Sequence, residues 1–375
     1  MALATTLLGC GGLLTRSLLR LIDTQPGFDP RGVLTMEVSL PPKRYATPES
    51  RARFYRELLE QVRRVPGVDE AAGCTNLPFG WGENINTFEI VGRPKPQPAP
   101  FANIDSVEPD YFRAMRIPLR AGRFLNERDG PGAELAVVID ETIADGYFAG
   151  GNPVGQQVRM PWDRPFTIVG VVGGVKSAGL DAVIRPKLYF SGLQSPGTDR
   201  TLVIRSGLAE GGLKSAVQRI VTGIDRDQPV YDVLPLEARI AKSLRTRRMV
   251  AELTGLFAGS GMLLAAIGLY GVLAYSMALR RREIGIRVVL GADRWSVGWL
   301  IARSGLAMGA AGSLAGGAAV LIAQRVAGPL EDARVGDALV WMTVLGVVEL
   351  SCAVACGIPA WRAGRMEPME SLRAE

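Results

Sequence analysis

The sequence predicts a membrane protein with four transmembrane α-helices and a large α+β domain inserted after the first helix. The chain has 375 residues, which is enough for about two domains. Hydrophobic residues make up 47% of it, which is high for a soluble protein but low for a chain of membrane helices alone. The longest apolar runs lie near the two ends of the chain, with a more polar stretch between them. A membrane part joined to a water-exposed part is therefore expected.

The first apolar segment is short. Residues 1–15 carry no charged side chain, but as a helix they would reach only about 22 Å, less than the ~30 Å of the bilayer core. Extending the helix further places Arg16 and Arg20 at the membrane rim. We therefore expect residues 1–22 to form a first transmembrane helix truncated at its cytoplasmic start, which would make the chain part of a longer reading frame. The "LLGC" at residues 7–10 resembles a lipobox, but no basic region precedes it, so a lipoprotein is the weaker interpretation.

Residues 25–245 have the pattern of a water-exposed domain. Residues 33–40 alternate like a strand, and residues 48–68 follow as an amphipathic helix that ends at a Pro-Gly stop. Strands and helices then mix without a regular βαβ repeat, which favours an α+β fold. Further strands are expected at 86–92, 103–107, 134–139, 154–160, 166–175, 187–191 and 201–206, and helices at 109–115, 140–147 and 209–224. The expected parts are one subdomain of residues 30–78 and 198–240 and an insertion of residues 80–195.

The C-terminal part, residues 250–375, contains three apolar runs of spanning length. Leu253–Leu279 has no charge and would reach roughly 40 Å as a helix. Ser304–Ala323 is also uncharged, and Ala338–Ala360 is interrupted only by Glu349. Each run alone could be a buried core helix, but three of them close together favour membrane spans. The expected helices cover about residues 250–279, 295–323 and 338–360, and residues 280–294 connect the first two.

The distribution of arginine sets the expected orientation. Residues 280–294 contain a cluster of arginines, so this loop is expected on the cytoplasmic side. Counting spans then puts Arg362 and Arg365 inside and the large domain outside. Arg16 and Arg20 conflict with this orientation, because they would lie at the outer end of the first helix. The other loops contain more arginines in positions that agree with it, so we keep the predicted orientation.

Small and polar residues in the apolar runs are candidate packing sites. Glycines with G-x-x-x-G spacing let helix backbones approach closely, and packing within the chain and a dimer interface explain them equally well. Glu349 at mid-bilayer would cost about 2–3 kcal/mol on insertion scales, so it should face the bundle or another protomer, as a packing contact rather than a functional relay. Cys352 and Cys356 share one helix face and have no histidine beside them, which favours small packing residues over metal ligands. The glycine candidates are Gly305, Gly309, Gly312 and Gly316.

The sequence lacks residues and motifs that several classes of enzyme require. It contains no histidine, so Ser-His and Cys-His catalysis and histidine metal sites are excluded. It has no P-loop to hold nucleotide phosphates, so no cofactor is expected in this chain. Asp225 and Asp227 form a D-x-D pattern that is more typical of a solvated turn than of a metal site. The net charge of +6 lies mostly beside apolar runs, which favours membrane-facing arginine over a nucleic-acid partner.

Several stretches together resemble one family. "RRREIGIRVVLGADRWSV" (280–297) resembles the cytoplasmic signature of FtsX/MacB-type permeases, and "GIPAWRAGRMEPMESLRAE" (357–375) resembles their C-terminal ending. "VEPDYFRAMRIPLRAGRFLNERD" (107–129) and "FTIVGVVGGVKSAGL" (166–180) are similar to the MacB-type periplasmic core domain. The resemblance covers almost the whole chain. It implies a four-helix permease protomer of an ABC-type system in the bacterial inner membrane, with its large domain in the periplasm or extracytoplasmic space.

The resemblance gives residues 280–294 a role. Such a segment would be a short coupling helix that docks into a groove of a cytoplasmic ATPase. Glu283 and Arg287 are four residues apart and can pair, and Ile284 and Ile286 would anchor the helix. From the residues alone, a helix lying on anionic membrane lipid explains the pattern equally well. The candidate coupling residues are Arg282, Glu283, Ile284, Gly285, Ile286, Arg287, Leu290 and Gly291.

The implied function is a non-catalytic permease in which ATP is hydrolysed by a partner ATPase. Export or efflux is implied, and a second permease protomer or half and a periplasmic adaptor or substrate are implied partners. A mechanotransmitter that regulates a cell-wall hydrolase or sensor shares every motif and is the alternative. MacB carries its ATPase ahead of the first helix, whereas this chain has none. Either a separate ATPase serves the chain, or the chain is the C-terminal half of a duplicated permease.

Overall fold

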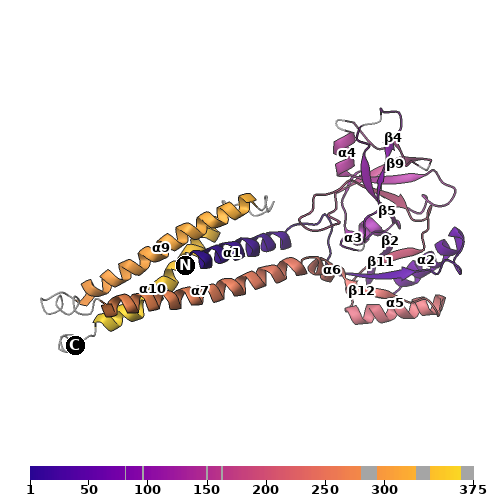
Figure 1. Cartoon of the computed structure of the whole chain (residues 1–375). Helices are drawn as coiled ribbons and strands as arrows, with labels where there is room; N and C mark the ends of the chain where they lie inside the picture. Colours follow the sequence, from indigo (N-terminus) through magenta and orange to yellow (C-terminus); the bar gives the residue numbers. More distant parts are fainter. Residues whose placement is uncertain are drawn as a thin grey trace. The chain divides into compact units, whose positions relative to one another are not determined.

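The chain forms two compact units. A computed structural model describes residues 1–80, 82–94, 97–148, 151–161, 164–279, 294–326 and 338–364 (Figure 1). One unit, the membrane unit, consists of Met1–Asp23 and Leu244–Glu375, and the other, the domain, consists of Thr24–Ser243. The predicted fold class is confirmed: a membrane helix comes first, a domain with strands and helices follows, and further membrane helices complete the chain.

The membrane unit is a helix bundle. In the described residues, 4 helices are long and apolar enough to cross a membrane. α1 packs against the other three, and α10 also packs against α7 and α9. The buried apolar cluster of the bundle includes Leu13 of α1, Leu269 of α7, Val320 of α9 and Val348 of α10. The four helices are α1 (Ala2–Ile22), α7 (Arg245–Leu279), α9 (Arg294–Val326) and α10 (Ala338–Gly364).

The outward faces of these helices are apolar as well. Leu256 and Leu264 of α7 are each 68% exposed, and Leu350 of α10 is 66% exposed. In water such a surface would cause aggregation, because large contiguous apolar patches drive association. In a bilayer it contacts acyl chains, so the same residues match their surroundings.

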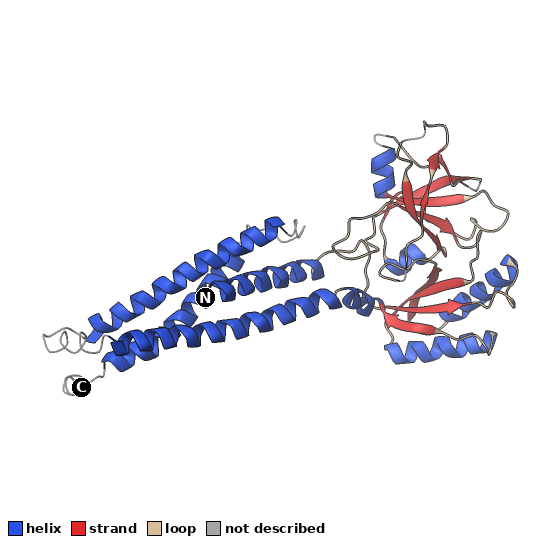
Figure 2. Ribbon diagram, in the orientation of Figure 1, coloured by secondary structure: helices blue, strands red, loops and turns tan. Residues whose placement is uncertain are grey.

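The domain is built on one sheet, which in the described residues has 12 strands (Figure 2). The strand order is β12-β1-β11-β2-β5-β10-β7-β9-β8-β4, with β3 paired to β5 and β6 paired to β9. The strands are β1 (Val33–Ser39), β2 (Val68–Cys74), β3 (Ile85–Thr87), β4 (Glu89–Ile90), β5 (Phe101–Val107), β6 (Leu119–Gly122), β7 (Ala136–Asp140), β8 (Gln157–Arg159), β9 (Pro165–Val172), β10 (Lys187–Ser191), β11 (Asp199–Ser206) and β12 (Tyr231–Pro235). The helices are α2 (Pro48–Arg63), α3 (Tyr111–Met115), α4 (Glu141–Tyr147), α5 (Glu210–Ile224) and α6 (Leu236–Ser243).

Two amphipathic helices pack with the β12-β1-β11-β2 part of the sheet. α2 begins where Thr47 accepts a hydrogen bond from the Ser50 backbone N–H at 3.2 Å, with Pro48 as the first helical residue. α5 presents Leu213, Val217 and Val221 at spacings of four, so all three lie on one face. These side chains join the apolar residues of β1 and β11 in one buried cluster.

Strands β10 and β7 at the middle of the sheet are buried on both faces. Because side chains alternate along a strand, Leu188 and Tyr189 of β10 enter two different apolar clusters. Tyr189 packs edge-on against Phe112 of α3, with ring centroids 5.1 Å apart. Leu188 lies with Ile143 of α4 on the other side. A sheet buried on both faces must satisfy any charged residue within it, and Lys187 of the same strand is such a residue.

The D-x-D pattern forms a turn, as expected, but only half of it is solvated. The Asp227 backbone N–H donates to Asp225 Oδ1 at 3.1 Å. Asp227 is 86% exposed, whereas Asp225 is 2% exposed, so the prediction of a solvated turn was wrong for Asp225. Asp225 accepts a hydrogen bond from the Tyr45 hydroxyl at 2.8 Å and pairs with Arg44 at 2.8 Å. Both partners precede α2, so Asp225 ties the end of α5 to that segment.

Candidate functional site

The residues expected to contact an ATPase lie outside the described residues. α7 ends at Leu279 and α9 begins at Arg294, so the segment between them joins two membrane helices. The coupling candidates in this segment therefore remain predictions. They are Arg282, Glu283, Ile284, Gly285, Ile286, Arg287, Leu290 and Gly291.

The first glycine pair of α9 faces α10. A Cβ built on Gly305 would overlap the Sγ of Cys356, and one built on Gly309 would lie 2.7 Å from the Sγ of Cys352. Real Cβ atoms essentially never come this close to another heavy atom, so only glycine fits at the present helix separation. Both cysteines are buried. The two pairs form a seam in which the small residues of one helix receive the sulfur atoms of the other.

The second glycine pair faces α1. A Cβ on Gly316 would lie 2.6 Å from Thr5 Cβ and 2.7 Å from the Ala2 carbonyl oxygen, and one on Gly312 would lie 2.5 Å from Met1 Cβ. The Thr6 hydroxyl donates a hydrogen bond to the Gly316 carbonyl at 3.4 Å. Both glycine pairs thus contact helices of the same chain, as close packing of small residues in membranes allows.

Glu349 lies on α10 beside the same seam. A Cβ on Gly309 would be 3.5 Å from Glu349 Oε2, and Cys352, three residues further along α10, is fully buried. Glu349 is itself half-buried. The carboxylate therefore lies near the α9 contact rather than on the opposite face of α10.

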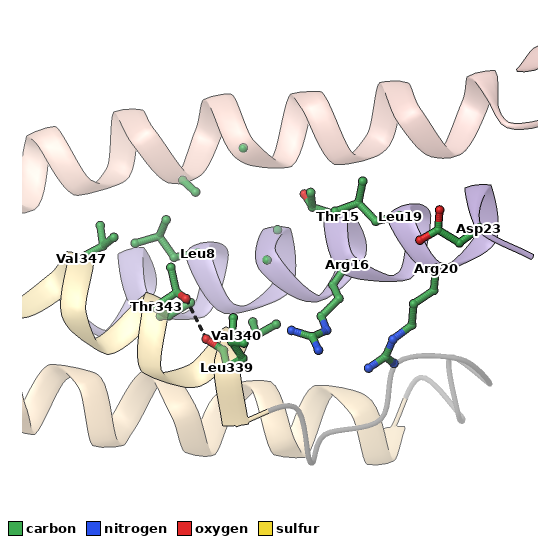
Figure 3. Close-up of a pocket in the computed structure, with 15 residues that line it drawn as sticks. Leu8, Thr15, Arg16, Leu19, Arg20, Asp23, Leu339, Val340, Thr343 and Val347 are labelled. Carbon is green, nitrogen blue, oxygen red and sulfur yellow. Dashed lines mark hydrogen bonds between the residues drawn. The ribbon is translucent and has the colours of Figure 1, made fainter.

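A groove runs between α1, α7 and α10 (Figure 3). Its walls are mostly aliphatic, and Gly11, Gly12 and Gly255 leave space in them. At one end Arg16 and Arg20 project from α1, and in Figure 3 their guanidinium groups lie on the same side of that helix. This end is the one from which the chain continues into the domain, because α1 ends at Ile22.

An arginine fixes α6, the last helix of the domain, to the sheet. Arg239 is 5% exposed, and its Nε donates to the Thr35 hydroxyl of β1 at 2.6 Å. Its other guanidinium nitrogens donate to the Asp232 carboxylate at 2.6 Å and to the Asp232 carbonyl at 2.7 Å. Three charge-assisted bonds from one planar group restrict both position and orientation. α6 therefore belongs to the rigid part of the domain, and only Leu244 separates it in sequence from α7.

Charged side chains are buried at the centre of the sheet. Lys187 Nζ of β10 lies 3.2 Å from Asp105 Oδ2 of β5, and these side chains are 2% and 0% exposed. Asp105 Oδ1 accepts hydrogen bonds from the Thr75 backbone and hydroxyl and from the Asn76 backbone at 2.9–3.0 Å. Asp140, at the end of β7, is also buried. Burial raises its pKa to about 6, although bonds from Thr142 and Ile143 and the charge of Lys187 act in the opposite direction.

Replacing Asp140 by asparagine should flatten the pH dependence of domain stability. The folded-state pKa of about 6 exceeds the ordinary 3.8, so the folded domain holds this proton more tightly. The stability contribution of Asp140 therefore falls as pH rises from about 4 to 6 and stays low above pH 6, a loss of roughly 3 kcal/mol. Urea unfolding of the full chain in detergent, read by pulse proteolysis at several pH values, measures this. If the Asp140→Asn curve runs parallel to that of the unmodified chain, the assignment is wrong.

A polar cleft lies on the other face of β5 and β10. Ile104, Ser106 and Phe190 line it from these strands, and Asn84 and Asn86 contribute amide groups near β3. The cleft measures about 730 Å³. The ring of Phe190 meets that of Phe166 edge-on at 4.6 Å, which gives one wall an aromatic surface. The sequence alone does not reveal this cleft, because its lining comes from segments far apart in the chain.

Two observations limit the chemistry of the described residues. In the described ranges no group of three or more His, Cys, Asp or Glu side chains could hold a metal ion. Cys74 is fully buried, and burial raises the pKa of its thiol well above the usual value, which disfavours the reactive thiolate. Close-packed membrane helices with a large inserted domain are typical of a membrane transport component.

The chain belongs to the family of membrane permeases that combine a MacB-like periplasmic core domain with an FtsX-like permease domain. Residues 11–224 match the MacB-like periplasmic core domain, and residues 255–368 match the FtsX-like permease C-terminal domain. It is accordingly an FtsX-like permease of the inner membrane, and residues 24–243 lie on the extracytoplasmic side.

Curated relatives are export proteins. The chain is 25% identical over 279 residues to the pyoverdine export ATP-binding/permease protein PvdT of Pseudomonas aeruginosa, covering 71% of this chain and 41% of that protein. It is 26% identical over 334 residues to PvdT of Pseudomonas fluorescens, covering 84% of this chain and 47% of that protein. The chain thus spans less than half the length of these relatives. The crystal structure of the periplasmic region of MacB from Actinobacillus actinomycetemcomitans covers 60% of this chain and 98% of that chain, with 15% identity and a TM-score of 0.41.

Proposed function

We propose that the chain couples a cytoplasmic ABC-type ATPase to its extracytoplasmic domain in an export or efflux system. In this proposal ATP is bound and hydrolysed by the ATPase, and the chain contributes motion rather than chemistry. A second permease protomer or half completes the transporter, and a periplasmic adaptor or the substrate meets the domain. The names of the curated relatives, which are export proteins, support the direction of transport.

The observation that carries the proposal is the continuity of α7. This helix has 35 residues and would be about 52 Å long, compared with ~30 Å for the bilayer core. In sequence it starts one residue after α6 and ends where residues 280–294 begin. A force applied at that segment would therefore act on one stiff element that leads back to the domain.

The hydrogen bonds of Arg239 support the same path from the domain end. Because this buried side chain holds α6 to β1 and to the segment of Asp232, α6 cannot turn without moving the sheet. In this proposal, a displacement of α7 passes along the chain through Leu244 to α6 and moves the domain, which is a common form of conformational switching.

The double variant Glu283→Lys with Ile284→Asp should abolish co-purification of the ATPase while the chain still inserts into the membrane. The first change reverses a charge, and the second puts a carboxylate on the proposed apolar anchor. A pull-down from solubilised membranes measures the bound ATPase, and protease protection of the domain measures insertion.

The matched control is Glu57→Lys with Val183→Asp. It introduces the same two kinds of change on the domain, where Glu57 is exposed and Val183 is 85% exposed. This control should leave the ATPase bound. If Glu283→Lys with Ile284→Asp retains as much ATPase as the control, residues 280–294 are not the coupling segment.

A further inference from the structure

The groove between α1, α7 and α10 has the chemistry of a lipid site. Leu8 of α1 and Val340, Val344 and Val347 of α10 give it aliphatic walls. Gly255 of α7 opens it from the third side, and a Cβ built there would meet nothing within 4 Å. The volume is about 680 Å³. A recess of this kind between membrane helices accepts an apolar chain.

The charged end of the groove indicates that a bound ligand would have an anionic group at that end. Arg16 and Arg20 are one helical turn apart on α1, and Figure 3 shows both side chains projecting to the same side of that helix. Both also interact within the chain, but a guanidinium has five N–H donors and can serve more than one acceptor. Asp23 lies at the same end, and its carboxylate points to the other side of α1 in Figure 3. Two positive charges therefore face one side of the groove.

The distance along α1 between the aliphatic end and the charged end of the groove matches the thickness of one leaflet of the bilayer. From Leu8 to Arg16 the α1 axis rises about 12 Å, close to the ~15 Å of one half of the hydrocarbon core. The arginines lie at the extracytoplasmic end of α1, where insertion rules do not favour positive charge. An anionic ligand on this side would add to the interactions that both arginines already make within the chain.

We propose that the groove binds an anionic glycerophospholipid of the outer leaflet. The phosphate would lie against Arg16 and Arg20, since arginine binds phosphate through paired N–H donors. One acyl chain would lie along Leu8, Val340 and Val344. The lipid would then fill the space between α1 and α10 and stabilise their packing. This inference does not depend on the ATPase coupling proposed above.

Native mass spectrometry of the purified full chain tests the inference, with phosphatidylglycerol or phosphatidylcholine added in equal amounts. The unmodified chain should retain phosphatidylglycerol in preference. Arg16→Gln with Arg20→Gln should lower that retention about tenfold, because charge-assisted bonds are lost. Arg245→Gln with Arg248→Gln removes the same charge at the start of α7 and should retain the lipid. Gly255→Leu should also lower retention without changing charge, by filling the apolar part.

Three results would overturn the inference. One is equal retention of the two lipids by the unmodified chain. Another is equal loss from the Arg16/Arg20 and Arg245/Arg248 variants, which would indicate a general charge effect. The third concerns a second copy of the chain. If the groove is instead covered by a second copy of the chain, the Arg16/Arg20 variant would lose dimer rather than lipid, and the lipid site would be rejected. Unchanged helical circular dichroism checks that each variant is folded.

Discussion

Replacing Lys187 by methionine should destabilise the extracytoplasmic domain by roughly 3–5 kcal/mol, as expected when one member of a buried ion pair is removed. Methionine has a similar length, so the change removes a charge with little loss of volume. Asp105 would then remain at the centre of the sheet without the Lys187 ammonium group, which lies 3.2 Å from Asp105 Oδ2 in the unmodified chain. The measurement is the free energy of unfolding from urea titration of the full chain, read by pulse proteolysis.

A compensating variant separates lost charge balance from general damage. Adding Asp105→Asn to Lys187→Met removes the uncompensated charge and keeps an oxygen that can accept the bonds from Thr75 and Asn76. This double variant should recover most of the stability. Arg113→Met breaks a pair with Asp110 whose arginine is 63% exposed, so it should change stability by less than about 1 kcal/mol. A double variant as unstable as Lys187→Met alone would contradict the ion-pair explanation.

Replacing Gly316 by alanine should destabilise the membrane unit by about 1–3 kcal/mol, the usual cost of inserting a methyl group into a close-packed contact. The new Cβ would lie 2.7 Å from the Ala2 carbonyl oxygen, and a backbone atom can move only if a whole helix shifts. Gly317→Ala is the matched control, since its Cβ would lie no closer than 3.8 Å to Trp341. Helical circular dichroism during titration with SDS in mixed micelles measures the difference.

The α9–α10 contact offers a compensating pair. Gly305→Ala should destabilise the bundle because its Cβ would overlap Cys356 Sγ, and adding Cys356→Ala should restore stability, since the nearest remaining Cys356 atom would be its Cβ at 3.6 Å. If Cys356→Ala brings no recovery, α9 and α10 do not pack through this seam.

The membrane helices could be predicted from sequence because their signal is local. The three C-terminal apolar runs are long, and arginines follow the end of α7 in the sequence. The predicted start of this helix at about residue 250 was five residues late, because Arg245–Val250 is helical but contains three arginines and therefore gives no apolar signal. Helix formation depends on the backbone and continues beyond the bilayer.

The domain was predicted less completely because its signals are not local. The expected strand at 86–92 is two short strands, β3 and β4, with Phe88 between them. β6 was missed because its Leu119 and Arg120 are both exposed and give no apolar alternation. The pairing of Lys187 with Asp105 depends on the parallel register of β5 and β10, which sequence does not specify. A lysine beginning the buried run "KLYFS" was the one local sign of an internal charge.

The candidate sites also differ in how far a local sequence pattern predicts them. G-x-x-x-G spacing singled out Gly305, Gly309, Gly312 and Gly316, but it could not distinguish contacts within the chain from contacts between chains. The lipid groove joins α1 to α10, which are more than 300 residues apart in sequence, so no local pattern contains it. From the sequence, Arg16 and Arg20 could be recognised only as arginines on the side of the membrane where positive charge is not expected.

The most direct test of the account is the side of the membrane on which residues 280–294 lie. Val289→Cys, in a chain whose four cysteines are replaced by alanine, should resist a membrane-impermeant maleimide in intact spheroplasts and react after permeabilisation. Co-expression of the ATPase should then protect it. Val183→Cys, on the domain, should react in both preparations, because Val183 is 85% exposed. Reaction of Val289→Cys in intact spheroplasts would place the segment outside, where no cytoplasmic ATPase could drive it, and would contradict the account.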